Sequence, residues 1–478
     1  MSPTKKSPVK NTRAKTFVTK LKKEKIEFLS LYFTDVIGKF HSITFSVEHL
    51  SPEDLESWVM FDGSSIEGFK SINHSDMILK PDIETYFKEI NTDIPTGAVI
   101  CDIIEPSNGE LYIRDPRGTL ARVQKHLNTS WIWDTAYFWA EPEFFMFPSE
   151  SVDIENGIIE NTQFYSHKTK KKKNYFQPSY FDPHKETRSK IVKAMNKVGV
   201  ITTLHHSEVW VNQNEIGTKF NEALLAADDV QKHKYIVHSM LKDTEKVASF
   251  MPKPVPDDNG SGMHMHQSIW KNGENTFAGN KYANLSQIAL WYIWWIRKHA
   301  KAINAFSNPT INSYKRLVPG FEAPSHLAYS SKNRSAGIRI PYSNSKKWVR
   351  IEVRFPDASA NPYLAMSAMI MAGLDGIQNK IDPGKYTNKN LDALTKTEAA
   401  QIPTTSETLK ISLESLNEDR EFLKKWWVFS DDQIDGYIEL KKQEIKFIET
   451  KISEEREEKQ KHKKNQTTKA EVQQYFWV

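Results

Sequence analysis

Two glutamates stand two positions apart in an otherwise apolar stretch of the chain. The stretch, YFWAEPEFFMF, runs from Tyr137 to Phe147 and is typical of a buried strand. Because side chains at i and i+2 of a strand point to one face, Glu141 and Glu143 are expected side by side. Adjacent carboxylates repel each other in apolar surroundings unless a cation lies between them. A metal ion is one interpretation, and a strand end that turns toward water is the other.

Two further segments carry ligand-type side chains at short spacing. Glu208 and Glu215 flank a short turn in the segment HHSEVWVNQNE, and His264 and His266 share one face of the segment GSGMHMHQS. Taken alone, each His pair is more often structural than metal-binding. Together the segments supply four glutamates and at least one imidazole. This donor set suits Mg²⁺ or Mn²⁺ better than zinc, because the sequence has no cysteine cluster.

Arginines gather further along the chain. In the run WVRIEVRFPD, alternation gives one apolar face and places Arg350, Glu352 and Arg354 on the other. Upstream, the run NRSAGIRIP adds Arg334 and Arg339. An exposed, salt-bridged sheet face would explain the first row by itself. The alternative is a site for carboxylate or phosphate, which guanidinium groups bind bidentately.

A polar loop precedes these arginines. The segment NPTINSYKRLVPGFEAP, residues 308–324, lies between a helical pattern and a strand pattern and carries Arg316 and Glu322. Long loops in compact domains are usually functional or disordered. The sequence has neither a G-x-x-x-x-G-K-[ST] loop nor a dinucleotide fingerprint. A nucleotide would therefore be held by metal and arginine, which favours phosphoryl transfer as the reaction.

The elements that position these residues are of both kinds. Strand alternation is visible at 28–33 and 97–104, and the Asp-Pro-Arg at 115–117 predicts a helix with proline at its first position. We place the main domain boundary there. Helical spacing over 284–306 predicts one core helix, and 413–459 is helical and charged. Periodicity alone supports a mixed α/β chain.

Composition sets further bounds. With 478 residues the chain exceeds one typical core, and 39% hydrophobic and 12% aromatic residues are ample for an ordered interior. Cys101 is the single cysteine, so an intramolecular disulfide is impossible and a reducing compartment is expected. The first 25 residues lack the apolar core of a secretory signal, and the apolar stretch 288–296 is too short to span a bilayer. We expect a soluble, cytoplasmic protein without membrane partners.

The net charge of +5 is concentrated in three runs. Nine Lys or Arg lie between positions 5 and 25, and further runs lie at 170–173 and 459–464. Solvated tails and an exposed loop are the favoured interpretation. Nucleic-acid binding is the other, but no helix-turn-helix, zinc-finger or RNA-binding signature supports it.

In their order along the chain, these motifs resemble those of type I glutamine synthetase, the prokaryotic ammonia-assimilating enzyme. The resemblance extends from about residue 25 to about residue 380. The stretch FDGSSIEGF, residues 61–69, matches the family's ammonium-site loop, and 308–324 matches its substrate-binding loop and closing flap. The resemblance implies an α+β fold, with a small N-terminal β-grasp-like domain before a large catalytic domain whose curved antiparallel sheet is flanked by helices. The expected parts are a basic flexible tail at 1–24, the β-grasp domain at 25–115, the catalytic domain at 116–455 and a C-terminal tail at 456–478.

The resemblance also implies residue roles. One metal ion would be held by Glu143, Glu208 and Glu215, and another by Glu141, His264 and Glu352. L-Glutamate would contact Glu143, Asn259, Gly260, Arg316, Arg334 and Arg354. ATP would contact Gly217, Thr218, Lys219, Phe220, His266, Gln267, Ser268, Arg339 and Lys347. Ammonium would bind at Asp62 and Ser65, and Glu322 would also contact the substrates. The expected catalytic residues are Asp62, Arg339 and Glu322.

The reaction implied is ATP-dependent ligation of ammonia to glutamate through γ-glutamyl phosphate. The γ-carboxylate is a poor electrophile until phosphorylated, ammonium must lose a proton before it can attack, and the flap carrying Glu322 would exclude water. The family's ammonium-site loop reaches into a neighbouring subunit, which implies a homo-oligomer, typically two stacked hexameric rings. A small regulatory protein is a further possible partner.

Three positions depart from the family pattern. Asn212 stands where a glycine usually precedes Gln213. The segment NKNLD, residues 388–392, has no tyrosine for adenylylation, and Lys70-Ser71 replaces the neutral residue and arginine linked to glutamine feedback. Both forms of control are therefore not expected here. Two alternatives remain open: a γ-glutamyl-amine ligase of the same fold, and a non-catalytic structural or regulatory relative. The intact Asp62 and Ser65 argue against the first, and the six candidate metal ligands against the second.

Overall fold

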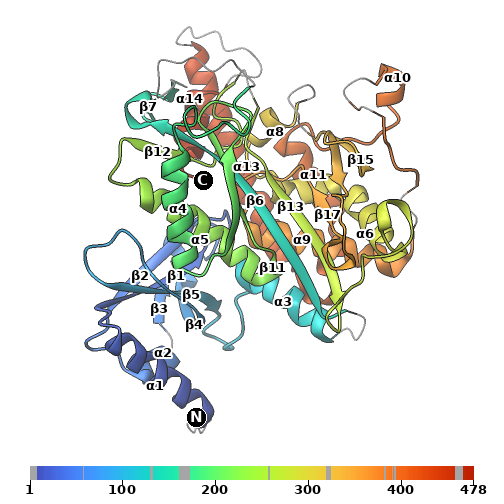
Figure 1. Cartoon of the computed structure of the whole chain (residues 1–478). Coiled ribbons are helices and arrows are strands. Elements are labelled where there is room, and N and C mark those ends of the chain that lie inside the picture. The colour runs from blue at the N-terminus through green and yellow to red at the C-terminus, as the bar shows by residue number, and fades with distance from the viewer. Residues whose placement is uncertain are drawn as a thin grey trace.

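The computed structural model describes residues 8–57, 59–70, 72–129, 133–160, 173–256, 259–318, 324–381, 384–389, 391, 394–457 and 467–478. Figure 1 shows a smaller N-terminal domain in blue beside a larger domain that holds the rest of the chain. Most of the lysine-rich insert near 168–173, the basic run at 459–464 and Glu322 lie outside the described residues.

The N-terminal domain is built on a five-stranded sheet in the order β2-β1-β5-β4-β3. Its strands are β1 (Phe28–Thr34), β2 (Phe40–Ser46), β3 (Val59–Asp62), β4 (Asp76–Lys88) and β5 (Thr96–Ile104). The central strands β1 and β5 run parallel, and their outer neighbours are antiparallel to them. Two strands separated by other elements can pair in parallel only through a crossover, as in a β-grasp arrangement.

A helix stands where a flexible basic tail was expected. Helix α1 spans Pro8–Lys23 and is followed, after β2, by the short α2 (Pro52–Ser57). Ala14, Phe17, Val18 and Leu21 are buried and recur at helical spacing, so they form one apolar face against the sheet. The expectation of a flexible tail is therefore wrong for residues 8–23, because the lysines occupy the other face of this helix.

The larger domain is organised around a mainly antiparallel sheet. Its hydrogen-bonded strands follow the order β15-β16-β17-β13-β6-β10-β9. In addition, β11 and β12 pair with β6, and β14 pairs with β13. Figure 1 shows β6 and β13 side by side through the middle of this domain. The strands are β6 (Thr135–Pro148), β9 (Thr202–Ser207), β10 (Gln213–Thr218), β11 (Asn221–Glu222), β12 (Lys246–Ser249), β13 (Met263–Lys271), β14 (Glu274–Asn275), β15 (His326–Ser330), β16 (Ala336–Arg339) and β17 (Ile351–Val353).

The strand register brings distant polar residues together. Glu141 on β6 lies opposite His264 on β13, and Glu143 lies opposite Glu215 on β10. Glu352 on β17 is opposite both His266 and Arg339. Antiparallel partners have their side chains on the same face, so the sheet gathers these groups on one side.

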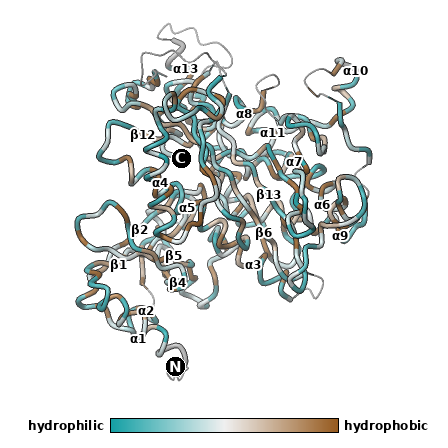
Figure 2. The backbone as a smooth tube through the Cα atoms, viewed as in Figure 1, coloured by the Kyte–Doolittle hydropathy of each residue, from teal (hydrophilic) through white to brown (hydrophobic). Residues whose placement is uncertain are grey.

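The larger domain contains helices as well, some of which pack on this sheet. They are α3 (Pro116–Thr129), α4 (Lys185–Lys197), α5 (Ala223–Leu241), α6 (Gln287–Lys298), α7 (Ala300–Ser307), α8 (Ser313–Arg316), α9 (Pro362–Asn379), α10 (Lys396–Ala399), α11 (Leu409–Glu418), α12 (Glu421–Lys424), α13 (Asp431–Glu457) and α14 (Lys469–Tyr475). Helix α9 is buried on every side up to Ile377, with Asn361 as its N-cap and proline at its first turn. In Figure 2 the outer loops are mostly teal, and brown segments gather in the interior. The α+β expectation is confirmed.

The single helix expected over 284–306 is divided in two. His299 ends α6 and precedes α7. Its ring stacks on Phe422 at 3.9 Å, and its Nδ1 lies 2.6 Å from a carboxylate oxygen of Asp419. Contacts with the following helices therefore override the local helical pattern here.

The C-terminal tail is also replaced by ordered structure. Helix α14 packs against the larger domain, and its Tyr475 and the following Phe476 are buried. Phe476 contacts a cluster that includes Phe145 and Trp210. The apolar end of the chain thus docks onto its own larger domain, which corrects the expectation of a tail for residues 467–478.

A buried ionic cluster joins the two domains. Arg117, at the start of α3, lies 2.8 Å from Asp82 and 2.5 Å from Asp102, both on strands of the N-terminal domain, and 3.0 Å from Asp228 on α5. The Arg117 side chain is 3% exposed. Removing one partner from such a cluster would leave buried charge uncompensated. Among the described helices, none is both long enough and apolar enough to cross a membrane.

Candidate functional site

A polar cavity of about 650 Å³ contains all six predicted metal ligands and most of the predicted glutamate-binding residues. Strand β6 contributes Glu141 and Glu143, and β13 and β17 contribute His264 and Glu352. Glu208 and Glu215 come from the turn before β10 and from β10 itself. Five more predicted residues line the same cavity: Asn259, Gly260, Arg316, Arg334 and Arg354. Arg339 also lines it.

The candidate ligands form two groups. In the first, ligand atoms of Glu141, His266 and Glu352 all lie within 4.8 Å of one another. Nδ1 of His264 lies 3.6 Å from Glu141 Oε2 and 3.9 Å from Glu352 Oε1. In the second, ligand atoms of His206, Glu208 and Glu215 all lie within 4.8 Å of one another. His264 Nε2 lies 3.9 Å from Glu143 Oε1, so this imidazole borders both groups. Carboxylate and imidazole donors at these separations fit divalent cations such as Mg²⁺ or Mn²⁺.

The first group lies among histidines and arginines, which stabilise its carboxylates. Burial raises the pKa of Glu352, but His266, Arg354 and His264 outweigh it and bring that pKa to about 2. Burial likewise opposes ionisation of Glu141, yet the neighbouring His266 and His264 hold its pKa well below the usual value. Both carboxylates are therefore ionised in the folded chain, as ligands of a cation must be.

The second group has the opposite balance. Burial and the repulsion of Glu143 raise the pKa of Glu208 well above 4.5, and burial together with Glu141 does the same for Glu215. Two buried carboxylates that resist ionisation beside each other gain most from a positive partner. The donor set and its electrostatics therefore fit a divalent cation.

His266 holds Glu141 from the neighbouring position. Arg350 donates from Nε to His266 Nδ1 over 3.1 Å, so this ring nitrogen is an acceptor and the hydrogen is on Nε2. His266 Nε2 lies 3.2 Å from Glu141 Oε2. A carboxylate oriented by an imidazole N–H is a common arrangement around metal sites.

The turn between Glu208 and Glu215 is built around Asn212 and Gln213. Asn212 has a φ of 66°, in the left-handed region that favours glycine or asparagine. Its side-chain oxygen lies 3.0 Å from His184 Nε2. Gln213 donates from Nε2 to Glu143 Oε2 over 2.9 Å and to the carbonyl of Gly260 over 3.2 Å. The turn thus connects three of the segments that line the cavity.

The arginines are held by the backbone and by Glu352. Arg316 is 6% exposed and donates to the carbonyls of Phe355, at 2.9 Å, and Arg354, at 3.1 Å. Arg339 and Arg354 both donate to Glu352. The guanidinium groups are therefore fixed in place at the wall of the cavity, as pre-organised recognition of an anion requires.

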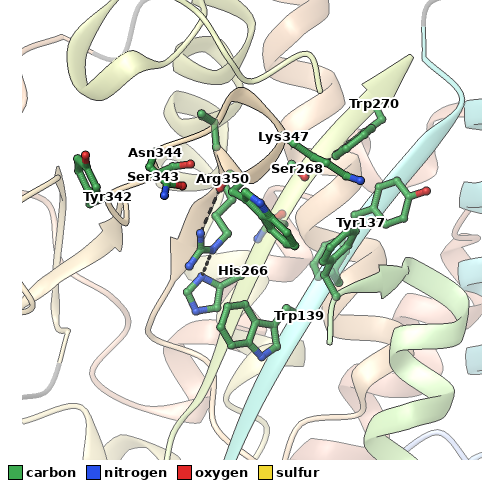
Figure 3. Close-up of a pocket in the computed structure, with 15 residues that line it drawn as sticks. Tyr137, Trp139, His266, Ser268, Trp270, Tyr342, Ser343, Asn344, Lys347 and Arg350 are labelled. Atoms are coloured by element: carbon green, nitrogen blue, oxygen red, sulfur yellow. Dashed lines mark hydrogen bonds between the residues drawn. The ribbon is translucent and has the colours of Figure 1, made fainter. Parts of the chain in front are cut away.

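A second pocket, of about 390 Å³, lies next to the polar cavity and is lined by aromatic rings (Figure 3). Trp139 stacks on His266 with ring centres 4.5 Å apart, and Trp348 meets Phe220 edge-on at 5.2 Å. Ser268, Lys347 and Arg350 add polar groups. Flat aromatic walls with a few polar groups are suited to a heteroaromatic ring.

Four residues predicted to bind ATP line this pocket together with Lys347: Phe220, His266, Gln267 and Ser268. The amide of Gln267 is occupied by Tyr292 and Met369. Gly217 and Thr218, at the end of β10, and Lys219 are outside the described linings of both cavities.

Models of two known domains match the chain. The glutamine synthetase β-grasp domain matches residues 25–106, and the glutamine synthetase catalytic domain matches residues 113–459. The chain belongs to the glutamine synthetase family. The positions of the predicted domain ends at 24, 115 and 455 stay a prediction.

Individual relatives agree with the family assignment. The chain is similar to glutamine synthetase of Rhizobium meliloti strain 1021, with 45% identity over 91% of this chain and 96% of the relative. It is also similar to 3-hydroxylaminophenol mutase of Cupriavidus pinatubonensis, with 46% identity over 90% of this chain and 95% of the relative. Among solved structures, Plasmodium falciparum glutamine synthetase gives a TM-score of 0.83 at 30% identity and covers 94% of this chain and 98% of its own.

Within this family member, two predicted ammonium-site residues lie away from the polar cavity. Asp62 and Ser65 are exposed on the N-terminal domain, at the end of β3. The Asp62 carboxylate accepts hydrogen bonds from Ser64 and Ser65, and these bonds lower its pKa. Within the described residues of one chain, Asp62 therefore does not line the cavity that holds the two ligand groups.

The structure also adds residues to the site that sequence reasoning missed. His206 joins Glu208 and Glu215, and Tyr175 and Phe176 line the same cavity. Strand alternation could have found His206, because it stands two positions before Glu208. Tyr175 and Phe176 follow the lysine-rich insert and carry no spacing signal, so only the folded chain brings them to the cavity.

Proposed function

We propose that this chain catalyses the ATP-dependent ligation of ammonia to the γ-carboxylate of L-glutamate, giving L-glutamine, ADP and phosphate. The single observation that carries the proposal is the meeting of two ligand clusters and fixed arginines in one cavity of a glutamine synthetase family member. The aromatic pocket beside that cavity supplies room for the nucleotide.

In this proposal the six ligands hold two or more divalent cations, with Mg²⁺ or Mn²⁺ as the cation. Glu143, Glu208 and Glu215 would hold one, and Glu141, His264 and Glu352 would hold the other. His206 lies with Glu208 and Glu215, and His266 lies with Glu141 and Glu352, so these two rings would orient the ligands. A cation bound by these residues would neutralise the charge of the phosphate oxygens during the transfer.

The arginines that line the polar cavity would position the glutamate substrate. Its α-carboxylate would pair with Arg316 and Arg354, and its remaining polar groups would contact Glu143, Asn259, Gly260 and Arg334. ATP would lie with its base in the aromatic pocket, near Phe220 and Ser268, and with its phosphates toward Arg339 and Lys347. The predicted contacts of Gly217, Thr218 and Lys219 with ATP remain part of the proposal.

The chemistry follows from these placements. A γ-carboxylate oxygen of glutamate attacks the terminal phosphorus of ATP, and the bond to ADP breaks as γ-glutamyl phosphate forms. Arg339, which lines the polar cavity, would pair with the transferred phosphoryl group. Ammonium then gives one proton to Asp62, and ammonia attacks the acyl carbon. As the amide forms, the nitrogen loses a second proton, which the leaving phosphate takes. In this scheme Glu322, on the flap, helps exclude water from the acyl phosphate.

Because Asp62 and Ser65 lie away from the cavity of their own chain, the proposal requires a second copy to complete each site. We propose a cytoplasmic homo-oligomer of two stacked hexameric rings, in which the loop at 61–69 serves the neighbouring subunit. Ring oligomers form when each copy offers one patch to a different patch of the next.

The test is phosphate release from ATP in the presence of Mg²⁺, glutamate and ammonium. Release that needs both glutamate and ammonium, and that is lost in Glu352→Ala but kept in the exposed-surface control Glu414→Ala, supports the ligase. Release only with another amine would support a γ-glutamyl-amine ligase. An arm with 3-hydroxylaminophenol and no ATP tests the activity named for the Cupriavidus relative. No turnover from a well-folded oligomer would contradict the proposal.

A further inference from the structure

We infer that the C-terminal segment, residues 467–478, positions the two parts of the chain that hold the glutamate substrate. We call this segment the C-terminal clamp. The two parts are the 249–262 arm, which carries Asn259 and Gly260, and the 311–318 arm, which carries Arg316; residues 257–258 are outside the described part of the first arm. The inference rests on the proposed function for its kinetic consequence.

The clamp is centred on a buried carboxylate. Glu471 has no solvent exposure and belongs to a capping box at the start of α14. Its Oε2 accepts hydrogen bonds from the backbone and hydroxyl of Thr468, at 2.7 and 2.8 Å, and from Nζ of Lys315, at 2.5 Å. Lys315 directly precedes Arg316. Glu471, the third residue of α14, therefore caps this helix and also holds the helical turn that carries Arg316.

The same carboxylate connects to the other arm through Asn312. Asn312 donates from Nδ2 to Glu471 Oε1 over 3.4 Å and to the Lys253 carbonyl over 3.1 Å, and its Oδ1 accepts the Lys253 amide at 2.6 Å. Thr467 donates to that same carbonyl over 2.6 Å. The clamp, Asn312 and Lys253 thus form one hydrogen-bonded unit that ties the arms together.

Two further contacts fix the distal end of the clamp. Ser249 donates from Oγ to the carbonyl of Phe476 over 2.6 Å, and Tyr475 donates to Glu444 over 2.6 Å. The Phe476 ring is buried against Phe145, two positions after Glu143 on β6. Apolar burial therefore holds the clamp in place while its polar groups set the distance between the arms.

The arms have no room to move independently. A methyl group added at Gly260 would lie 2.3 Å from the carbonyl oxygen of Pro252 and 2.7 Å from Arg316 Cγ. At Gly262 it would lie 2.5 Å from an Arg316 guanidinium nitrogen. Because the interior is packed this tightly, a displacement of Lys315 passes directly to Arg316 and to the Gly260 backbone. Glu471 and Lys315 are accordingly positioning residues.

The experiment compares Glu471→Gln and Lys315→Met with the control Glu454→Gln, which breaks an exposed ion pair on α13. Lys315→Met leaves the buried Glu471 carboxylate without this cation, and Glu471→Gln removes the negative charge that faces Lys315. We expect the KM for glutamate to rise about tenfold, the scale typical of lost outer-shell support, with the KM for ATP nearly unchanged. The double variant Glu471→Gln/Lys315→Met removes both charges and should recover part of the loss.

Hydrogen exchange of the substrate-free protein supplies a readout that does not depend on turnover. In Glu471→Gln, backbone amides of 249–256 and 311–318 should exchange faster than in the wild type and in Glu454→Gln, while α9 keeps its protection. Unchanged exchange in both arms of a folded Glu471→Gln protein would overturn the inference. So would equal rises in the KM for glutamate and for ATP. Absence of turnover in the wild type would overturn the proposed function, and the exchange result would still decide the role of the clamp.

Discussion

At the scale of single residues, the candidate ligands divide by charge environment. Glu141 and Glu352 lie among histidines and arginines that keep them ionised, whereas Glu208 and Glu215 lie among other carboxylates. Strand alternation predicted that Glu141 and Glu143 would lie together. It could not predict which carboxylates would have histidine and arginine neighbours. Those neighbours come from β13, from β16 and from the position directly after β17, which only the sheet register brings alongside.

The two carboxylates with raised pKa values predict a pH-dependent response to metal removal. Without metal, Glu208 and Glu215 bind protons in the folded chain at pH values where the unfolded chain has lost them. Their contribution to the free energy of unfolding is therefore fully present below pH 4.5 and is lost as the pH rises through the folded pKa values. A bound cation replaces those protons, so stabilisation by Mg²⁺ should grow with pH.

The measurement is the Tm with Mg²⁺ and with EDTA, from about pH 5 to about pH 8. The gap between the two Tm values should widen as the pH rises. In the double variant Glu208→Gln/Glu215→Gln the gap should shrink and lose its pH dependence. A wild-type gap that stays constant over this range would contradict the prediction.

A second residue-scale prediction concerns Asn212 and its φ of 66°. Asn212→Ala should lower the free energy of unfolding by about 1–3 kcal/mol, because alanine is strained in this conformation and cannot bond to His184. Asn212→Gly avoids the strain but also lacks the bond to His184, so its loss of stability should be smaller than that of Asn212→Ala. Thermal unfolding of the three proteins in parallel checks this, and equal losses in both variants would show that the backbone conformation is not the cause.

At the scale of elements, the main differences from expectation lie at the two ends of the chain. The apolar spacing of α1 was present in the sequence, but the lysine count favoured a solvated tail. A tail was expected where α14 lies, and its docking site could not be predicted, because that site is assembled from β6, β12 and the turn at Trp210. Sequence periodicity reports that a face is apolar, while the partner of that face depends on tertiary structure.

The packing of α1 gives a prediction at this scale. Phe17→Ala should lower the free energy of unfolding by about 3–5 kcal/mol, because the ring is buried and lies 5.3 Å from that of Tyr86. Lys22→Ala, an exposed position of the same helix, should be within about 0.5 kcal/mol of the wild type. Chemical denaturation checks both. Equal stability of Phe17→Ala and Lys22→Ala would mean that α1 does not contribute to the folded core.

At the scale of the whole molecule, the residues predicted for one site are divided between its two domains. The six ligands gather in the larger domain, and Asp62 and Ser65 remain exposed on the smaller one. The six predicted ligands lie in one cavity, because most of them are on neighbouring strands of one sheet. Sequence order could not place Asp62 relative to them, because that relation depends on how copies of the chain meet.

Mixing two inactive variants tests this division. Asp62→Ala and Glu352→Ala should each be nearly inactive as homo-oligomers. Co-assembled in equal amounts, they should recover about a quarter of the sites, because some interfaces then pair an intact loop with an intact cavity. Phosphate release from the purified mixed assembly measures this. Recovery no greater than the sum of the two separate variants would contradict a site shared between copies.

The ionic cluster at Arg117 has a consequence for closure. In a head-to-tail contact of the proposed kind, the angle between the two domains of each copy sets the rotation from one copy to the next. A small error in that angle is repeated at every step and produces an open helix instead of a closed circle. Arg117 fixes the angle by pairing with Asp82 and Asp102 on one side and Asp228 on the other. In the proposed ring, this one buried guanidinium would therefore help set the rotation between neighbouring copies.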